Sequence, residues 1–197
     1  MGVHNLDTAF WALELGIPNH AKVIDADQGT ADCPPLWSII QMNYPARVNR
    51  PAVKLTFYDG KKLPPADLFY GEEIPSNGSL IIGSKGTLLT RTWHGGENED
   101  DMFLLLPKKT FIDYQTISPS VPRVRDHHFE WIQACKGLTK TEANFDYAAT
   151  LTEGLLVGQL ALRTGKSIAW DPQQMKAINC PEAESLIKPR FRKGWEI

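Results

Sequence analysis

The stretch AVKLTFYDG, residues 52–60, decides the fold class. Its apolar side chains alternate with more polar ones at a period of two, which is typical of a β-strand with one buried face. The strand is followed at once by Asp59-Gly60, a dipeptide strongly favoured in tight turns. A half-buried strand that ends in a turn favours an antiparallel sheet, because such sheets commonly keep only one face on the core.

Shorter strand patterns lie on both sides of this stretch. They are apolar or alternating runs bounded by Pro and Gly, and they cover residues 21–26, 36–43, 80–82, 87–89, 103–106 and 167–170. The two runs that flank GSKG, residues 83–86, predict a hairpin by composition.

Helical periodicity marks the beginning of the chain and its last third. Residues 4–15 are predicted to form a helix that ends before Gly16 and Pro18. Residues 147–163 are predicted to form another helix, terminated by Gly165. Gly154 and Gly158 lie one turn apart on it, so we expect a smooth patch where another part of the chain approaches closely.

A further predicted helix precedes Gly137. Its apolar face carries Val124, His128, Trp131, Ile132 and Cys135. We therefore expect Cys135 to be a small core residue and His128 a core histidine with satisfied hydrogen bonds.

This order of elements predicts an α+β fold, with an open, mostly antiparallel β-sheet and helices packed on one face. Residues 1–197 are expected to form one domain. The regular strand–helix alternation of a doubly wound fold is missing, and no GxGxxG follows a strand, so no phosphate cradle is predicted.

Composition excludes several classes of protein. The net charge is −2 and the 21 Lys and Arg residues are scattered, so no nucleic-acid partner is expected. No apolar run approaches the roughly 20 residues needed to cross a bilayer, so no membrane partner is expected either. The three cysteines are far apart and none has metal-ligand spacing, which predicts neither a disulfide framework nor a metal site.

His4 and Asp7 are the first candidate site. Residues three apart on a helix project from nearly the same face, so the imidazole and the carboxylate can face one ligand. The histidine suits proton transfer from a hydroxyl whose carbon loses hydride, and the carboxylate suits a neighbouring hydroxyl. On the pattern alone, a frayed terminal histidine and a first-turn acid favoured by the helix dipole are the simpler interpretation.

His127-His128 is the second candidate. Adjacent helical residues point about 100° apart, so the two rings cannot line one pocket equally. Because His128 falls on the apolar face, we assign His127, at the edge of that face, to substrate binding. The alternative is that His127 is merely exposed.

Six stretches, in order along nearly the whole chain, resemble one bacterial branch of the Gfo/Idh/MocA oxidoreductases, the family of glucose–fructose oxidoreductase and inositol dehydrogenase. MGVHNLD, residues 1–7, resembles the end of the Asp-x-Gly-x-His-x-x-Asp signature of that family. The others are GSKGTL (83–88), HHFEWIQACKG (127–137), NFDYA (144–148), LALRTGK (160–166) and FRKGW (191–195).

The resemblance implies an open sheet flanked by helices, like the C-terminal domain of dihydrodipicolinate reductase, whose sheet face forms a homodimer or higher oligomer. It also implies that intact relatives move hydride between NAD or NADP and a hydroxyl carbon of a sugar or polyol. In such relatives the signature histidine assists proton transfer and the final acid contacts the substrate. These roles map onto His4 as the catalytic residue and Asp7 as a substrate-binding residue.

The nucleotide-binding half of the family, with its Gly-rich loop and its Glu-Lys-Pro motif, has no counterpart in these 197 residues. We therefore expect this chain to bind no cofactor and to be inactive alone. It would be the substrate-binding and oligomerisation domain of a sugar or polyol oxidoreductase, and NAD or NADP would be bound by the N-terminal domain missing here.

Two other interpretations stay open. The chain could be a stand-alone carbohydrate-binding or dimerisation module without redox activity, with Trp93, Trp131, Trp170 and Tyr114 as sugar-stacking faces, although core aromatic residues explain them at least as well. It could also be a scaffold that associates with a separately encoded nucleotide domain.

Overall fold

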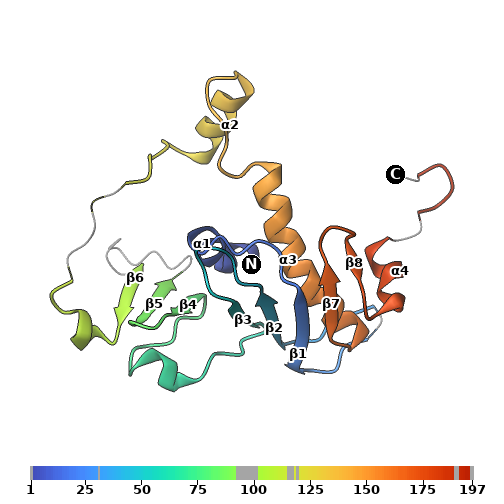
Figure 1. Ribbon diagram of the computed structural model, residues 1–197, viewed down its shortest axis with the longest axis horizontal. Coiled ribbons are helices and arrows are strands. Elements are labelled where there is room, and N and C mark those ends of the chain that lie inside the picture. The colour runs from blue at the N-terminus through green and yellow to red at the C-terminus, as the bar shows by residue number, and fades with distance from the viewer. Residues whose placement is uncertain are drawn as a thin grey trace.

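The computed structural model describes residues 2–30, 32–91, 102–114, 118, 120–188 and 191–195, and in them it contains two antiparallel sheets and four α-helices (Figure 1). The larger sheet has the strand order β3-β2-β1-β7-β8. Its strands are β1 (His20–Ala26), β2 (Ser38–Tyr44), β3 (Val53–Tyr58), β7 (Ile168–Asp171) and β8 (Lys176–Ala177). The predicted α+β class with an open, antiparallel arrangement is confirmed.

The smaller sheet consists of β4 (Gly78–Ile82), β5 (Thr87–Arg91) and β6 (Phe103–Leu106), in that order. Strands β4 and β5 form the predicted hairpin: Ile82 pairs with Thr87, and the Gly83 amide donates to the Gly86 carbonyl at 2.9 Å. The run 103–106 predicted from the sequence coincides with β6.

The expectation of one continuous sheet is wrong, and the connection between β3 and β4 gives the reason. Residues 59–77 fold into turns and the 3-10 helix η1 (Ala66–Phe69). Phe69 is buried with Leu89 and Leu106 in a small core of its own beside the three-stranded sheet. Because this separate core holds β4 beyond β3, each of the two strands remains the edge of its own sheet.

Helix α3 (Phe145–Thr164) covers one face of the larger sheet. Asn144 caps its beginning by accepting a hydrogen bond from the Tyr147 amide at 3.1 Å, and Gly165 ends it in the left-handed conformation, at φ 64°. Gly158 lies over β2, since a Cβ built there would be 3.2 Å from Met42 Sδ. The glycine patch predicted on this helix is therefore the place where β2 packs closely.

Helix α1 (Gly2–Ala12) packs against α3 and β4 through Leu6, Ala9 and Phe10. It ends three residues before the predicted end at Leu15. The Leu15 amide still donates to the Phe10 carbonyl at 3.1 Å, which closes the last turn, and Gly16 then adopts φ 71°.

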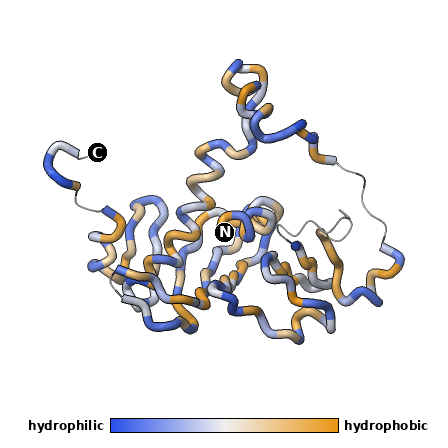
Figure 2. The backbone as a smooth tube through the Cα atoms, turned by 180° about the vertical axis from the view of Figure 1, so that it is seen from behind, coloured by the Kyte–Doolittle hydropathy of each residue, from blue (hydrophilic) through white to orange (hydrophobic). Residues whose placement is uncertain are grey.

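Helix α2 (His127–Cys135) begins at Asp126, whose carboxylate accepts a hydrogen bond from the Phe129 amide at 2.7 Å. Its predicted apolar face is not part of the core: none of its residues is buried, and His128 and Cys135 are exposed. The reason is its position, because α2 extends away from both sheets (Figures 1 and 2). The interpretation of these two residues as core residues is therefore wrong.

The main core lies between α1, α3 and the covered face of the larger sheet. It includes Phe10, Ile40, Met42, Tyr44, Leu151, Val157, Ala161, Ile168 and Trp170. The chain then passes through the 3-10 helix η4 (Pro181–Ala183) into the short helix α4 (Glu184–Ile187). Among the described residues, no helix is long and apolar enough to span a membrane.

Candidate functional site

The predicted pair His4 and Asp7 lies on the outer side of α1. Leu6, Ala9 and Phe10 face the core, and this fixes which side of the helix is left for solvent. The side chains of His4 and Asp7 are both exposed, one helical turn apart. A ligand that approaches α1 from outside can thus meet an imidazole and a carboxylate together.

Asp7 is also bound to a residue that the sequence interpretation did not include in the site. The Tyr147 hydroxyl, from the first turn of α3, donates a hydrogen bond to Asp7 Oδ1. The Tyr147 ring meets Phe10 edge-on, with ring centroids 5.4 Å apart. Phe10 lies one turn after Asp7, so Tyr147 contacts two successive turns of α1. The NFDYA stretch marked this region as similar to the family but gave no sign that its tyrosine reaches α1.

The surroundings of Tyr147 keep its hydroxyl protonated. Partial burial raises the pKa of Tyr147 well above its usual value, and the hydrogen bond to Asp7 and the negative charge of that carboxylate raise it further. Tyr147 is therefore a hydrogen-bond donor to Asp7 throughout the neutral pH range.

His127, the other predicted substrate-binding residue, lies elsewhere. It opens α2, where its ring is tilted against that of His128 at a centroid separation of 4.0 Å. Figure 1 places α2 beyond the beginning of α3 and away from α1. The structure brings Asp7 and Tyr147 together but does not bring His127 to them, and its role in binding a substrate stays a prediction.

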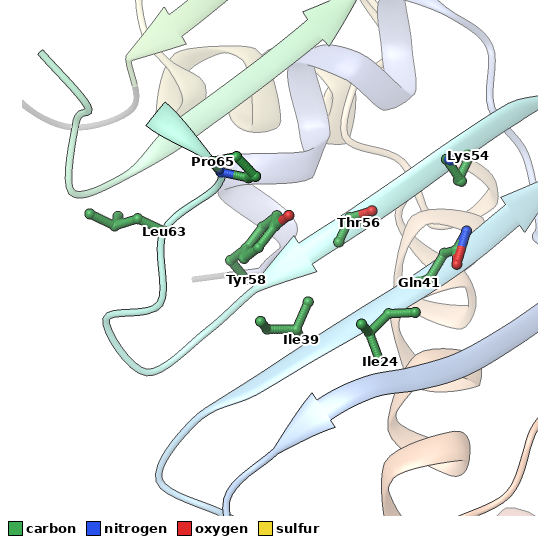
Figure 3. A pocket seen from close by; sticks show the side chains of 8 residues that line it. All are labelled: Ile24, Ile39, Gln41, Lys54, Thr56, Tyr58, Leu63 and Pro65. Carbon is green, nitrogen blue, oxygen red and sulfur yellow. The ribbon is translucent and has the colours of Figure 1, made fainter. Parts of the chain in front are cut away.

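A second surface of interest is the face of the larger sheet opposite α3. Residues Ile39 and Gln41 of β2 pair with Tyr58 and Thr56 of β3, so all four point to this side. Figure 3 looks onto this face, where a shallow hollow of about 480 Å³ is lined by Ile24, Ile39, Gln41, Lys54, Thr56, Tyr58, Leu63 and Pro65. Apolar and polar groups alternate across it.

A larger cleft of about 520 Å³ separates the two sheets at their facing edges. It is lined by every residue of β3 and β4, by the inner side of α1, and by the loop 59–64. Neither this cleft nor the hollow on the open face includes His4, Asp7 or Tyr147. His4 and Asp7 therefore lie on the exposed side of α1, outside both of these cavities.

The aromatic residues considered for sugar stacking have different surroundings. Trp131 and Tyr114 are exposed, whereas Trp170 is 5% exposed and donates from Nε1 to Glu153 Oε1 at 2.8 Å. Trp170 is a core residue, as the alternative interpretation held. Trp93 lies outside the described residues.

Among the described residues, two features bear on metal and phosphate binding. Within the described ranges, no group of three or more His, Cys, Asp or Glu side chains gathers in a way that could hold a metal ion. Gly83–Gly86 joins two strands, so it does not open a helix whose amides could bind a pyrophosphate. This segment is therefore not a pyrophosphate cradle of the kind formed at the start of a helix.

Comparisons with family models, with curated proteins and with solved structures find no match to this chain.

Proposed function

We propose that this chain is the substrate-binding and oligomerisation domain of an NAD- or NADP-dependent oxidoreductase that acts on a sugar or polyol. Its fold would be of the kind found in the C-terminal domain of dihydrodipicolinate reductase. The dinucleotide would be bound by a separate nucleotide-binding domain, because the Gly-rich loop and the Glu-Lys-Pro motif of the family have no counterpart in these 197 residues. By itself the chain would bind the substrate without turning it over.

The observation that carries this proposal is the arrangement on the outer side of α1. Asp7 is held by the Tyr147 hydroxyl, and His4 is exposed one turn earlier on the same helix. A carboxylate fixed in this way can accept a hydrogen bond from a substrate hydroxyl. His4 would take the proton from the hydroxyl that is oxidised to a carbonyl, a role that imidazole fills near neutral pH.

The position of these residues outside the two cavities also agrees with the proposal. A site shared between two domains is lined by one wall from each, so the wall on this chain need not be concave in isolation. His127 would belong to the same site only if the second domain extended from α1 to α2.

For the oligomer, the open face of the larger sheet is the supporting feature. Helix α3 covers only one face, while Ile24 and Leu63 on the other remain 51% and 48% exposed. Mixed with Gln41, Lys54 and Thr56, these residues have the composition of an interface between subunits that also exist separately. We propose that two copies pack through this face.

A binding experiment on the ¹⁵N-labelled chain tests the site. NMR titration with D-glucose, D-sorbitol and myo-inositol should move the amide signals of α1 and of the first turn of α3. Asp7→Ala should abolish these shifts, whereas His4→Ala should leave the affinity nearly unchanged, because its proposed role is proton transfer. Asp67→Ala, at an exposed acid on η1, is the matched control. Shifts confined to α2 and lost in Trp131→Ala would instead support a stand-alone carbohydrate-binding module.

Determining the coding sequence directly upstream of Met1 tests the redox part. We expect an in-frame nucleotide-binding domain that ends in Asp immediately before Met1. In the protein expressed from that longer frame, His4→Ala should lower the turnover rate by about 10²- to 10⁴-fold. An upstream sequence with no such domain, or an unchanged turnover rate, would contradict the assignment.

A further inference from the structure

The contact between Tyr147 and Asp7 leaves two oxygen acceptors side by side on one surface. Tyr147 uses its only hydroxyl hydrogen in the bond to Asp7 Oδ1, so its oxygen can still accept a hydrogen bond but has no second hydrogen to donate. Each oxygen of the Asp7 carboxylate has more than one acceptor site. The pair therefore presents two neighbouring acceptors at an exposed place, and a ligand can donate to both in place of water.

The two acceptors are held in place from both helices. The backbone of Tyr147 is fixed by the Asn144 cap at 3.1 Å, and its ring lies against Phe10 at a centroid distance of 5.4 Å. Asp7 and Phe10 belong to the same helix, so the contact with Phe10 and the hydrogen bond to Asp7 restrain the tyrosine together. A pair whose geometry is set before binding loses little side-chain entropy when a ligand arrives.

We propose that Tyr147 Oη and the Asp7 carboxylate form a paired acceptor site for a vicinal diol, with one hydroxyl of the ligand donating to each. This inference rests on the proposed function and narrows its substrate class to ligands with adjacent hydroxyls. The two oxygens of a gauche vicinal diol lie about as far apart as two hydrogen-bonded oxygens do. A diol can therefore match the spacing of the pair without distortion.

The same chemistry disfavours other ligands. An anionic ligand would meet the negative charge of Asp7, with Asp146 in the first turn of α3 close in sequence to Tyr147. A monoalcohol satisfies only one acceptor. A 1,3-diol has two hydroxyls but places them farther apart, so it can reach both acceptors only with a poorer geometry.

The test compares cis-cyclohexane-1,2-diol with cis-cyclohexane-1,3-diol, which have the same atoms and differ only in hydroxyl spacing. Their dissociation constants are measured by NMR titration of the intact 197-residue chain, beside the sugar and polyol panel used above. One net hydrogen bond changes an affinity by about 3- to 10-fold, so the 1,2-diol should bind tighter by that factor.

Tyr147→Phe removes one acceptor and keeps the ring against Phe10. It should abolish the preference for the 1,2-diol and weaken the binding of the sugar panel by a similar factor. Tyr114→Phe, at an exposed tyrosine outside the site, is the matched control and should change neither. Asp7→Asn keeps the size of the side chain. In the double variant with Tyr147→Phe, the loss of binding free energy should be smaller than the sum of the losses in the two single variants. Circular dichroism melts establish that each variant is folded.

The outcomes separate this inference from the proposed function. Sugar binding that depends on Asp7 but shows no preference for the 1,2-diol, or an undiminished preference in Tyr147→Phe, overturns the diol site and leaves the proposed function standing. Failure of the wild-type chain to bind any member of the sugar panel or either diol overturns both.

Discussion

Gly158 of α3 lies directly over Met42 of β2, with only 3.2 Å between Met42 Sδ and the place where a Cβ would stand. Ile40 Cγ2 is 3.3 Å from the same point. The helix and the sheet meet here without room for a side chain. We expect Gly158→Leu to lower the free energy of unfolding by at least about 1–3 kcal/mol, because it overpacks the core. Urea unfolding measures this, with Gln159→Leu at the next, exposed position of α3 as the control.

Tyr147 makes the free energy of unfolding of the protein depend on pH in the alkaline range. Its pKa in the folded state is raised by burial and by Asp7 above the value of about 10 expected for an unfolded chain. Its contribution is therefore present in full below pH 10 and is lost as the pH rises towards the folded pKa. Between pH 10 and 11, the free energy of unfolding of the wild type should fall more steeply than that of Tyr147→Phe, as measured by urea unfolding at several pH values.

The hydrogen bond from Tyr147 to Asp7 can be tested by spectroscopic titration. Asp7→Asn removes the negative charge that disfavours the phenolate, so the ionisation of Tyr147 should move to lower pH. The absorbance at 295 nm follows it, and a difference curve against Tyr147→Phe isolates this residue from the other four tyrosines. Coinciding curves for wild type and Asp7→Asn would show that the bond is not made in solution.

If copies pack through the open face of the larger sheet, Ile39→Asp should convert a dimer into a monomer in analytical ultracentrifugation. The substitution places a charge in the middle of the hollow seen in Figure 3, and a buried unpaired charge is costly in an interface. Leu156→Asp, at an exposed leucine on α3, adds the same charge outside the proposed interface and should leave the dimer intact. A wild-type chain that stays monomeric at high concentration would contradict the interface.

The position of α2 predicts an order of thiol reactivity. Cys33 and Cys135 are exposed, whereas Cys180 is 1% exposed. We expect two thiols to react promptly with 5,5′-dithiobis(2-nitrobenzoic acid) in the native protein and the third only after unfolding. Cys135→Ser should lower the fast phase by one thiol and change the melting temperature little. A Cys135 that reacted only with unfolding would mean that α2 is covered in solution.

Local signals in the sequence predicted the elements well. The alternation in residues 52–60, the glycines of the β4–β5 turn and Gly165 at the end of α3 act on their own neighbours, and each marks the element that is observed. The separation into two sheets depends instead on where Phe69 finds its partners Leu89 and Leu106, which is not encoded near any one of them.

For the candidate site, too, the local features could be predicted from the sequence and the long-range contact could not. The helical spacing of His4 and Asp7 placed them on one face of α1, because this is a local property of the chain. The hydrogen bond between Tyr147 and Asp7 joins residues 140 positions apart, and only the packing of α3 on α1 brings them together. The apolar face of α2 was wrongly expected to be part of the core for a related reason. Periodicity shows which side of a helix is apolar, but not whether anything lies against that side.

The edges of the larger sheet have a consequence for how large an assembly can grow. One edge is β8, a strand of two residues, and the other is β3, which faces β4 across the cleft. Addition of chains strand by strand, as in fibrils, needs a long free edge; β8 is too short to offer one, and the edge of β3 opens onto the cleft that β4 also lines. If two copies meet through the open face with the same patch on each partner, as proposed above, the contact closes around a two-fold axis. If the proposed interface forms in this way, association through it would stop at a pair.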